Sequence, residues 1–146
     1  MMVIENSGAK PGIYWSPDGT TIHSLTSAVE IPGISNGDIK GIRVTLDVDN
    51  GSGGRTVRFY ASSDLGETWD LLDTNAGGSV TSVYDSATSV LEVGARNSGT
   101  ALLATGGCLS AEVRDGIDGT IVASPNFTAP MEPRQRDAQG NIWTLS

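Results

Sequence analysis

Residues 41–62 read GIRVTLDVDNGSGGRTVRFYAS, and this stretch decides the fold class. Residues 41–49 alternate apolar with polar or charged side chains, and residues 55–62 repeat the alternation. A period of two predicts strands that bury one face and expose the other. Between them lies NGSGG at residues 50–54, which is typical of a tight hairpin connection. We therefore predict an antiparallel hairpin, and with it an all-β protein.

The rest of the chain favours the same class. Its 146 residues include 19 glycines and 6 prolines, which are spread along the sequence between short apolar runs. This distribution predicts an antiparallel β-sandwich of about nine to eleven short strands. We expect one domain over residues 1–146, with residues 1–14 as an N-terminal segment that can act as an arm. The further predicted strands lie at residues 68–72, 80–84, 90–95, 108–113, 120–123 and 141–145.

Charge and composition exclude several classes of partner. The formal net charge is −8, and the nine Lys and Arg residues are scattered. Binding to nucleic acid needs clustered basic side chains that neutralise phosphates, and anionic membranes attract the same kind of cluster. We therefore expect neither a nucleic-acid partner nor a membrane partner. The N-terminal MMVIENSGAK has no basic leader before an apolar run, so we expect no signal peptide.

No catalytic constellation is visible in the sequence. His23 is the single histidine and has no distinctive neighbours, whereas a hydrolytic triad needs a base beside a nucleophile. A carboxylate pair such as Asp70 and Asp73 is expected by chance among seventeen acidic residues. Cys108 is the single cysteine, which excludes an internal disulfide, and we interpret it as a small buried hydrophobe. We expect no enzyme.

Asp47, Asp49 and Asn50 are candidate calcium ligands, because hard oxygen ligands beside glycines suit that ion. The spacing differs from an EF-hand loop, since no glutamate stands at the closing position after Gly51. We expect no cofactor, and calcium is the one ion that the sequence brings into consideration.

Residues 62–69, SSDLGETW, fit the pattern S-x-D-x-G-x-T-W and resemble the Asp-box of sialidase-like propellers and other β-proteins. The physics of this motif is local: the Asp64 carboxylate accepts backbone N–H groups across a turn, the glycine takes a positive φ, and the tryptophan packs beneath. Residues 15–20 (WSPDGT) and 137–143 (DAQGNIW) are looser echoes. A propeller repeats such a unit in every blade and needs a longer chain. We therefore expect a structural role for Asp64.

Several stretches taken together are similar to the C-terminal part of the laminin-G-like (concanavalin-like) jelly-roll modules in structural proteins of tailed phages of actinobacteria and their prophages. The resemblance covers residues 41–146. It implies a jelly-roll sandwich that lacks its first strands and offers an open sheet edge to another chain. The family carries no catalytic set to transfer. The stretches are residues 44–51, 54–60, 64–69, 91–94, 111–117, 125–127 and 137–145.

The resemblance implies a non-enzymatic virion structural protein, displayed on the tail or capsid surface as a minor tail or capsid decoration protein. We expect it to act through protein–protein contacts with other virion proteins and to form a homo-oligomer. Its expected location is the virion, after synthesis in the host cytoplasm.

The alternative is a carbohydrate-binding adhesin that recognises host cell-surface glycans. Sugar binding uses an aromatic platform with a few fixed polar groups. The candidate residues are Tyr60, Tyr84 and Trp143. Tyr60 alternates with Val57 and Phe59, so it should face outward if those two side chains face the core.

Overall fold

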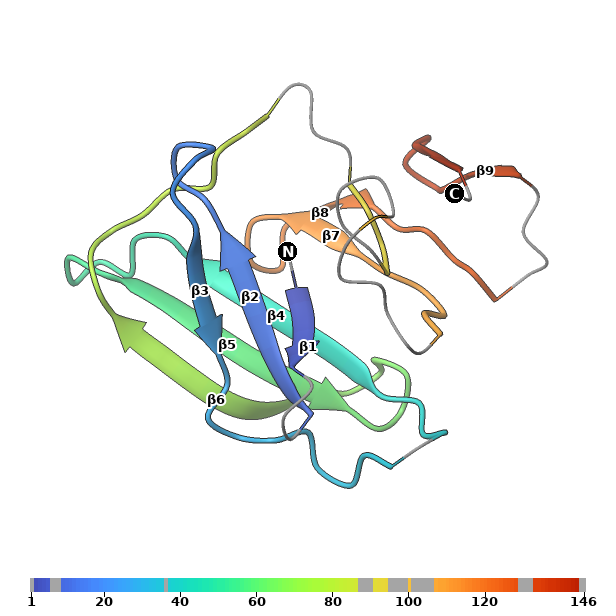
Figure 1. Ribbon diagram of the computed structural model, residues 1–146, viewed down its shortest axis with the longest axis horizontal. Coiled ribbons are helices and arrows are strands. Elements are labelled where there is room, and N and C mark those ends of the chain that lie inside the picture. The colour runs from blue at the N-terminus through green and yellow to red at the C-terminus, as the bar shows by residue number, and fades with distance from the viewer. Residues whose placement is uncertain are drawn as a thin grey trace. The chain divides into compact units, whose positions relative to one another are not determined.

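The computed structural model describes residues 2–5, 9–35, 37–86, 91–94, 100, 107–128 and 133–144 (Figure 1). These residues form ten strands in antiparallel sheets and contain no helix, which confirms the all-β class, while the jelly-roll topology stays a prediction. The chain divides into two compact units, Met1–Ala87 and Thr88–Ser146. The strands are β1 (Met2–Glu5), β2 (Lys10–Trp15), β3 (His23–Thr26), β4 (Gly41–Asp47), β5 (Arg55–Ser62), β6 (Asp70–Gly77), β7 (Val113–Asp115), β8 (Thr120–Ala123), β9 (Arg134–Arg136) and β10 (Ile142–Thr144).

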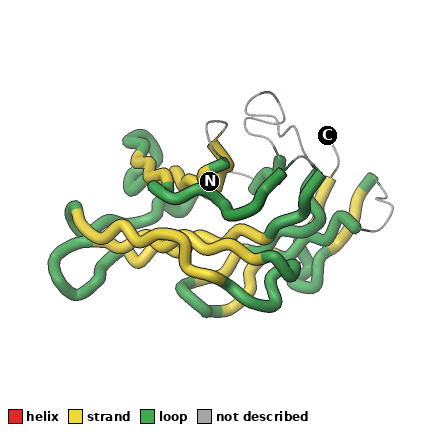
Figure 2. Tube along the Cα trace, turned by 90° about the horizontal axis from the view of Figure 1, so that it is seen from below, coloured by secondary structure: helices red, strands yellow, loops and turns green. Residues whose placement is uncertain are grey.

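The first unit consists of two three-stranded sheets, β1-β2-β3 and β4-β5-β6, and one lies over the other (Figures 1 and 2). The predicted hairpin is confirmed, because β4 pairs with β5 in a register that sets Val44 opposite Phe59. The segment expected as an arm contains β1 and most of β2, both of which are paired strands. The strand expected at residues 68–72 begins at Asp70 and extends to Gly77.

The core of the first unit lies between the two sheets. Val57 and Phe59 on β5 have no exposed surface, and Trp15 on β2 is also buried. Ala61, Ile31 and Pro11 complete the buried apolar side chains of this unit among the described residues. A hydrogen bond ties the layers together, since the backbone N–H of Ala28 after β3 donates to a carboxylate oxygen of Asp73 on β6 at 2.6 Å. The inward face predicted from the alternation is therefore confirmed.

The opposite face of the β4-β5-β6 sheet carries polar and aromatic side chains. Tyr60 stands opposite Arg43 in the β4–β5 register, and the Arg43 guanidinium lies 5.5 Å from the centre of the Tyr60 ring. Tyr60 therefore faces away from Val57 and Phe59, as its alternation predicted. A register irregularity between Phe59 and Tyr60 bends the pairing with β6 at this point.

The strand predicted at residues 80–84 is wrong, because this segment joins no sheet. Its backbone N–H groups divide between partners in different sheets. Thr81 donates to the carbonyl of Val48, just beyond β4, and Tyr84 donates to the carbonyl of Ser16, just beyond β2. The segment bridges the ends of the two sheets instead of extending either. Of the strand predicted at residues 90–95, residues 91–94 are not strand and the two end residues lie outside the described part of the chain.

The second unit contains two antiparallel hairpins, β7–β8 and β9–β10. The strand predicted at residues 120–123 is confirmed. The strand predicted at residues 141–145 is confirmed for residues 142–144. The strand predicted at residues 108–113 is mostly absent, since β7 begins at Val113 and Ser110 makes a single bridge to Asn126.

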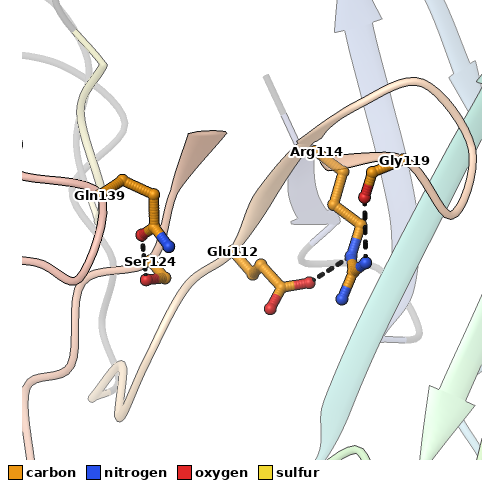
Figure 3. Close-up of polar contacts among 5 residues, drawn as sticks. All are labelled: Glu112, Arg114, Gly119, Ser124 and Gln139. Carbon is orange, nitrogen blue, oxygen red and sulfur yellow. Dashed lines mark hydrogen bonds and ion pairs between the residues drawn. The ribbon is translucent and has the colours of Figure 1, made fainter. Parts of the chain in front are cut away.

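Polar contacts organise this second unit, as Figure 3 shows. The Arg114 guanidinium donates to Glu112 at 2.6 Å and to the carbonyl of Gly119 at 3.1 Å, and so spans the β7–β8 turn (Figure 3). The hydroxyl of Ser124 donates to the side-chain oxygen of Gln139, which joins the two hairpins (Figure 3). These side chains are exposed, so each contact is worth little by itself.

The interpretation of Cys108 as a buried hydrophobe is wrong. Its side chain is exposed, and the thiol donates to the carbonyl of Ser110 at 3.2 Å. Partial desolvation nevertheless raises the pKa of the Cys108 thiol.

The core position of Phe59 leads to a stability prediction. Phe59→Ala should lower the free energy of unfolding by about 3–5 kcal/mol, because it removes a fully buried ring and leaves a cavity. Urea unfolding of the two proteins measures the difference. Leu71→Ala is the matched control on the neighbouring strand, since Leu71 is 56% exposed and its truncation should change stability by less than about 0.5 kcal/mol. Equal losses in the two variants would contradict this position of the core.

Candidate functional site

Two features concentrate the polar side chains of this protein: aspartate-held turns at three places in the chain, and a hollow beside Trp15. The turn after β5 shows the first feature. The Asp64 carboxylate accepts the Ser62 hydroxyl at 2.6 Å, the Thr68 backbone N–H at 3.0 Å and the Thr68 hydroxyl at 2.6 Å. The Ser62 hydroxyl oxygen in turn accepts the Gly66 N–H at 2.8 Å. Asp64 therefore closes the turn through local donors.

Gly66 and Trp69 complete the geometry of the Asp-box. Gly66 has φ of 96°, in the left-handed region that favours glycine. The Trp69 ring packs against it, because a Cβ atom added at Gly66 would lie 3.2 Å from Trp69 Cζ2. The predicted roles of Asp64, Gly66 and Trp69 are all confirmed.

The turn between β2 and β3 uses the same construction. Asp18 accepts the backbone N–H groups of Thr20 and Thr21 at 2.8 and 2.6 Å, and the Thr21 hydroxyl at 2.7 Å. Ser16 takes the part of Ser62, since its hydroxyl oxygen accepts the N–H of Gly19 at 2.8 Å. The threonine stands one position closer to the aspartate than in the Asp64 turn. Residues 15–20, which match the Asp-box pattern only loosely in sequence, therefore form the same kind of aspartate-closed turn in a shorter loop.

A third aspartate, Asp137, closes the β9–β10 turn and also accepts hydrogen bonds from outside that turn. Asp137 Oδ1 accepts the N–H groups of Gln139 at 3.0 Å and Asn141 at 2.8 Å. Its other oxygen accepts the Trp143 ring N–H at 3.0 Å and the backbone N–H of Ser124, after β8, also at 3.0 Å. One carboxylate thus fixes its own hairpin, orients Trp143 and joins the second unit's two hairpins.

These hydrogen bonds hold the carboxylates in the ionised form. The Thr21 hydroxyl is the largest cause of the lowered pKa of Asp18, and the Ser62 hydroxyl is the largest cause of the lowered pKa of Asp64. At Asp137 the largest effect is desolvation, which raises the pKa, but the combined hydrogen bonds outweigh it and the net pKa is lowered. Such groups serve as fixed acceptors and are poorly suited to donate a proton as a general acid.

The second feature is a hollow of about 320 Å³ in the first unit. The buried Trp15 ring supports it: the His23 ring stacks on Trp15 at 5.3 Å between centres, and the Arg55 guanidinium lies 5.2 Å from the ring centre. The Trp15 ring N–H donates to the hydroxyl oxygen of Thr81 at 3.1 Å, which holds the bridging segment in place. The hollow is lined by Pro17, His23, Arg55, Ser79, Val80, Thr81 and Ser82.

Arg55 dominates the electrostatics of this hollow. Among the described residues no carboxylate forms an ion pair with it. Its Nη1 makes one long hydrogen bond, 3.5 Å, to the Ser79 carbonyl, and its buried Nε–H has no acceptor. The backbone at Gly78 passes so close that an added Cβ would overlap Nη1. The guanidinium is therefore confined, positively charged and short of acceptors.

Of the candidate glycan-binding residues, the two tyrosines of the first unit do not form one platform. Tyr60 lies on the outer face of the β4-β5-β6 sheet, whereas the Tyr84 ring lies against Gly19 in the β2–β3 turn. Tyr84 is 52% exposed, and it follows the segment that lines the hollow. Trp143 belongs to the second unit, where its ring N–H is bonded to Asp137.

The candidate calcium ligands serve the β4–β5 hairpin. Asp49 accepts the N–H of Gly51 at 3.1 Å, and the Asn50 side-chain oxygen accepts the N–H groups of Ser52 and Gly54. In the described part of the chain, no group of three His, Cys, Asp or Glu side chains is arranged to hold a metal ion. The same residues include no helix with the length and hydropathy of a membrane span.

Sequence patterns gave no sign of the hollow, for a physical reason. Its lining comes from three separate segments: the residues around the β2–β3 turn, the first residue of β5, and the bridge after β6. No spacing rule connects residues that meet only after two sheets have packed. The one local signal is Gly77-Gly78, whose second glycine leaves room for Arg55.

The Asp64 turn leads to a prediction about Gly66. Gly66→Ala should cost about 1–2 kcal/mol for the left-handed backbone, with a further loss because the new Cβ presses on Trp69. Gly51→Ala is the matched control: φ is 74° there, and nothing lies within 4 Å of an added Cβ. Urea unfolding should show the larger loss at Gly66, and equal losses would contradict the packing of Trp69 against this turn.

The three lowered pKa values lead to a prediction about acid. Because the pKa of each carboxyl in the folded state lies below its ordinary value of about 3.9, the unfolded chain binds these protons more readily. Their stabilising contribution is therefore complete above about pH 5 and is lost as the pH falls below about 4 towards the lowered values. Urea midpoints between pH 7 and pH 2 measure this loss.

The control for the acid experiment is the double variant Asp18→Asn with Asp64→Asn. It should be less stable than the unchanged protein at pH 7 and should lose less stability on acidification, because it lacks two of the three aspartates whose pKa values are lowered by folding. An acid dependence as steep as that of the unchanged protein would show that other groups carry it.

Comparison of the chain with protein-family models, with curated proteins and with solved structures finds no match.

Proposed function

We propose that this chain is a non-enzymatic structural protein of a bacteriophage virion, which works through protein–protein contacts at the tail or capsid surface. The phage assignment comes from the sequence resemblance over residues 41–146. The observation that carries a contact role is the amount of apolar side-chain surface that the described residues leave exposed.

The second unit shows this most clearly. Ala123 and Pro125 are its buried residues among those that the structure describes. Two-stranded hairpins are marginally stable in water unless a further layer covers an apolar face. A partner chain that covers these side chains would supply the missing burial. The exposed large hydrophobic residues of this unit are Leu91, Leu109, Val113, Ile117, Val122 and Ile142.

The sheets of the first unit also offer edges. In the described residues β4 and β6 each pair on one side only, with β5. Such an edge presents unpaired backbone N–H and C=O groups to a neighbouring strand. Edge pairing is one route by which a second copy or another virion protein can attach.

The proposed absence of catalysis rests on the state of the acidic groups. The three aspartates with strongly perturbed pKa values are held ionised by turn donors, which is a structural use of the carboxylate. General-acid catalysis at neutral pH needs the opposite perturbation, a raised carboxyl pKa.

The contact role predicts a self-associating protein. We expect light scattering to show an oligomer, and Val122→Lys to shift it toward monomer, because a charge on the β7–β8 hairpin opposes burial of its apolar surface. Ser52→Lys is the control and should leave the oligomer unchanged, since Ser52 is an exposed polar residue in the β4–β5 turn of the other unit.

Purified particles provide the second arm of this test. The protein should be present in them, and cryo-electron microscopy should place it on the tail or capsid surface. A monomer at all concentrations, together with absence from purified particles, would overturn the proposed function.

Carbohydrate binding is the second candidate function, and one observation favours it. The half-exposed Tyr84 ring stands two residues after Ser82, which lines the hollow and whose hydroxyl donates to the Pro17 carbonyl at 3.2 Å, and the Tyr84 backbone N–H is bonded to Ser16. An exposed ring beside a polar hollow is the usual composition of a sugar site. In this proposal Tyr84 is the stacking residue, while Tyr60 and Trp143 belong to other places in the fold.

A further inference from the structure

The hollow beside Trp15 contains a cation that the described part of the chain does not neutralise. Arg55 has five N–H donors, and the structure assigns an acceptor to one of them, the Ser79 carbonyl at 3.5 Å. A guanidinium with a buried donor and no acceptor carries an energetic penalty. An anion bound in the hollow would give the remaining donors on the terminal nitrogens their acceptors.

The guanidinium is also held ready for a ligand. The Trp15 ring lies on one side at 5.2 Å, and the close approach of Gly78 restricts it on another. Confinement reduces the conformational entropy that the side chain would lose on binding. The chain's net charge of −8 repels anions at long range, so recognition at this point depends on the local cation.

The other walls of the hollow favour a small polyhydroxylated molecule. Ser79, Thr81 and Ser82 are the hydroxyl-bearing residues of the lining, and Pro17 and Val80 contribute apolar surface. The Thr81 and Ser82 hydroxyls already donate to the carbonyls of Ser82 and Pro17, so their oxygens can serve a ligand as acceptors. A volume of about 320 Å³ lies at the small end of ligand sites, which suits one sugar unit and is small for a larger cofactor.

We propose that the hollow binds the carboxylate of an acidic sugar unit, a uronic acid, with Arg55 as the anchoring residue. The planar guanidinium matches a carboxylate with two parallel N–H···O bonds, which is the strongest polar contact that this site can offer. Ser79 lines the same hollow, and the Ser82 hydroxyl oxygen, whose proton is donated to the Pro17 carbonyl at 3.2 Å, keeps acceptor capacity for a sugar hydroxyl. The proposal names the ligand class for the second candidate function and rests on it.

Trp15 provides a built-in reporter for the test. Its ring N–H is bonded to Thr81, which lines the hollow, so a bound ligand should move the nuclear magnetic resonance signal of this group. Trp69, in the Asp64 turn, is not among the residues that line the hollow and acts as an internal reference. The full-length protein is titrated with glucuronate, glucose, acetate and sulfate.

We expect glucuronate to shift the Trp15 signal with saturation, acetate to do so more weakly, and glucose to leave it unchanged. Arg55→Gln should weaken glucuronate binding at least about tenfold, because a charge-assisted pair is lost. Arg55→Lys keeps a positive charge beside the Trp15 ring and tests whether the loss in Arg55→Gln comes from misfolding. It should still weaken glucuronate binding, since lysine cannot donate two parallel hydrogen bonds to a carboxylate. Arg58→Gln, on the outer face of the same strand, should bind as the unchanged protein does.

Several results would overturn the proposal. Equal shifts with glucose would remove the role of the carboxylate, and sulfate as effective as glucuronate would show a general anion site. Tighter binding of a peptide with a free C-terminal carboxylate would replace the sugar with a peptide ligand. Binding of neutral glycans without any effect of glucuronate would leave the carbohydrate function standing and remove this inference. The virion role is tested separately by the oligomeric state and the particle analysis.

Discussion

The hydrogen bonds from backbone N–H groups to three aspartate carboxylates are the constraint on which the rest of this structure depends. A tight turn leaves N–H groups that no strand partner can accept, and burying or ordering them without an acceptor is costly. Asp18, Asp64 and Asp137 each accept at least two donors within four residues along the chain. The hairpins that these turns close, or the strands that they connect, then bring Trp15 and Phe59 into one core and hold the second unit together with little apolar burial.

Aromatic rings form part of the surroundings of two arginines in the first unit. Arg43 and Arg55 belong to neighbouring strands, and each lies over an aromatic ring, Tyr60 on the outer face and Trp15 on the inner side. An aromatic face attracts a guanidinium through the negative charge of its ring face. The Arg55–Trp15 contact differs from the Arg43–Tyr60 contact, because it holds the charged guanidinium in the lining of the hollow.

Local patterns carried most of the correct predictions. The period-two alternation of residues 41–62 gave the β4–β5 hairpin and its buried face, and the complete S-x-D-x-G-x-T-W match gave the geometry around Asp64. The turn at Asp18 was harder to recognise because its carboxylate reaches Thr21 three residues on, whereas Asp64 reaches Thr68 four residues on. The turn at Asp137 keeps the four-residue spacing to Asn141, but its glycine and tryptophan stand one position later than those after Asp64. The failures were non-local. Residues 80–84 look like a strand, yet their hydrogen bonds connect two sheets, and the hollow forms only where three distant segments meet.

The small apolar interior of the second unit has a consequence for its response to temperature. The heat capacity change of unfolding comes mainly from apolar surface that becomes hydrated, and newly exposed polar groups subtract from it. A unit held by Asp137, Ser124 and Arg114, with Ala123 and Pro125 as its buried residues among those described, has little of the first contribution and much of the second. These described residues therefore contribute little to the heat capacity change of unfolding, and they favour a shallow stability curve on which warming and cooling change the free energy of unfolding slowly.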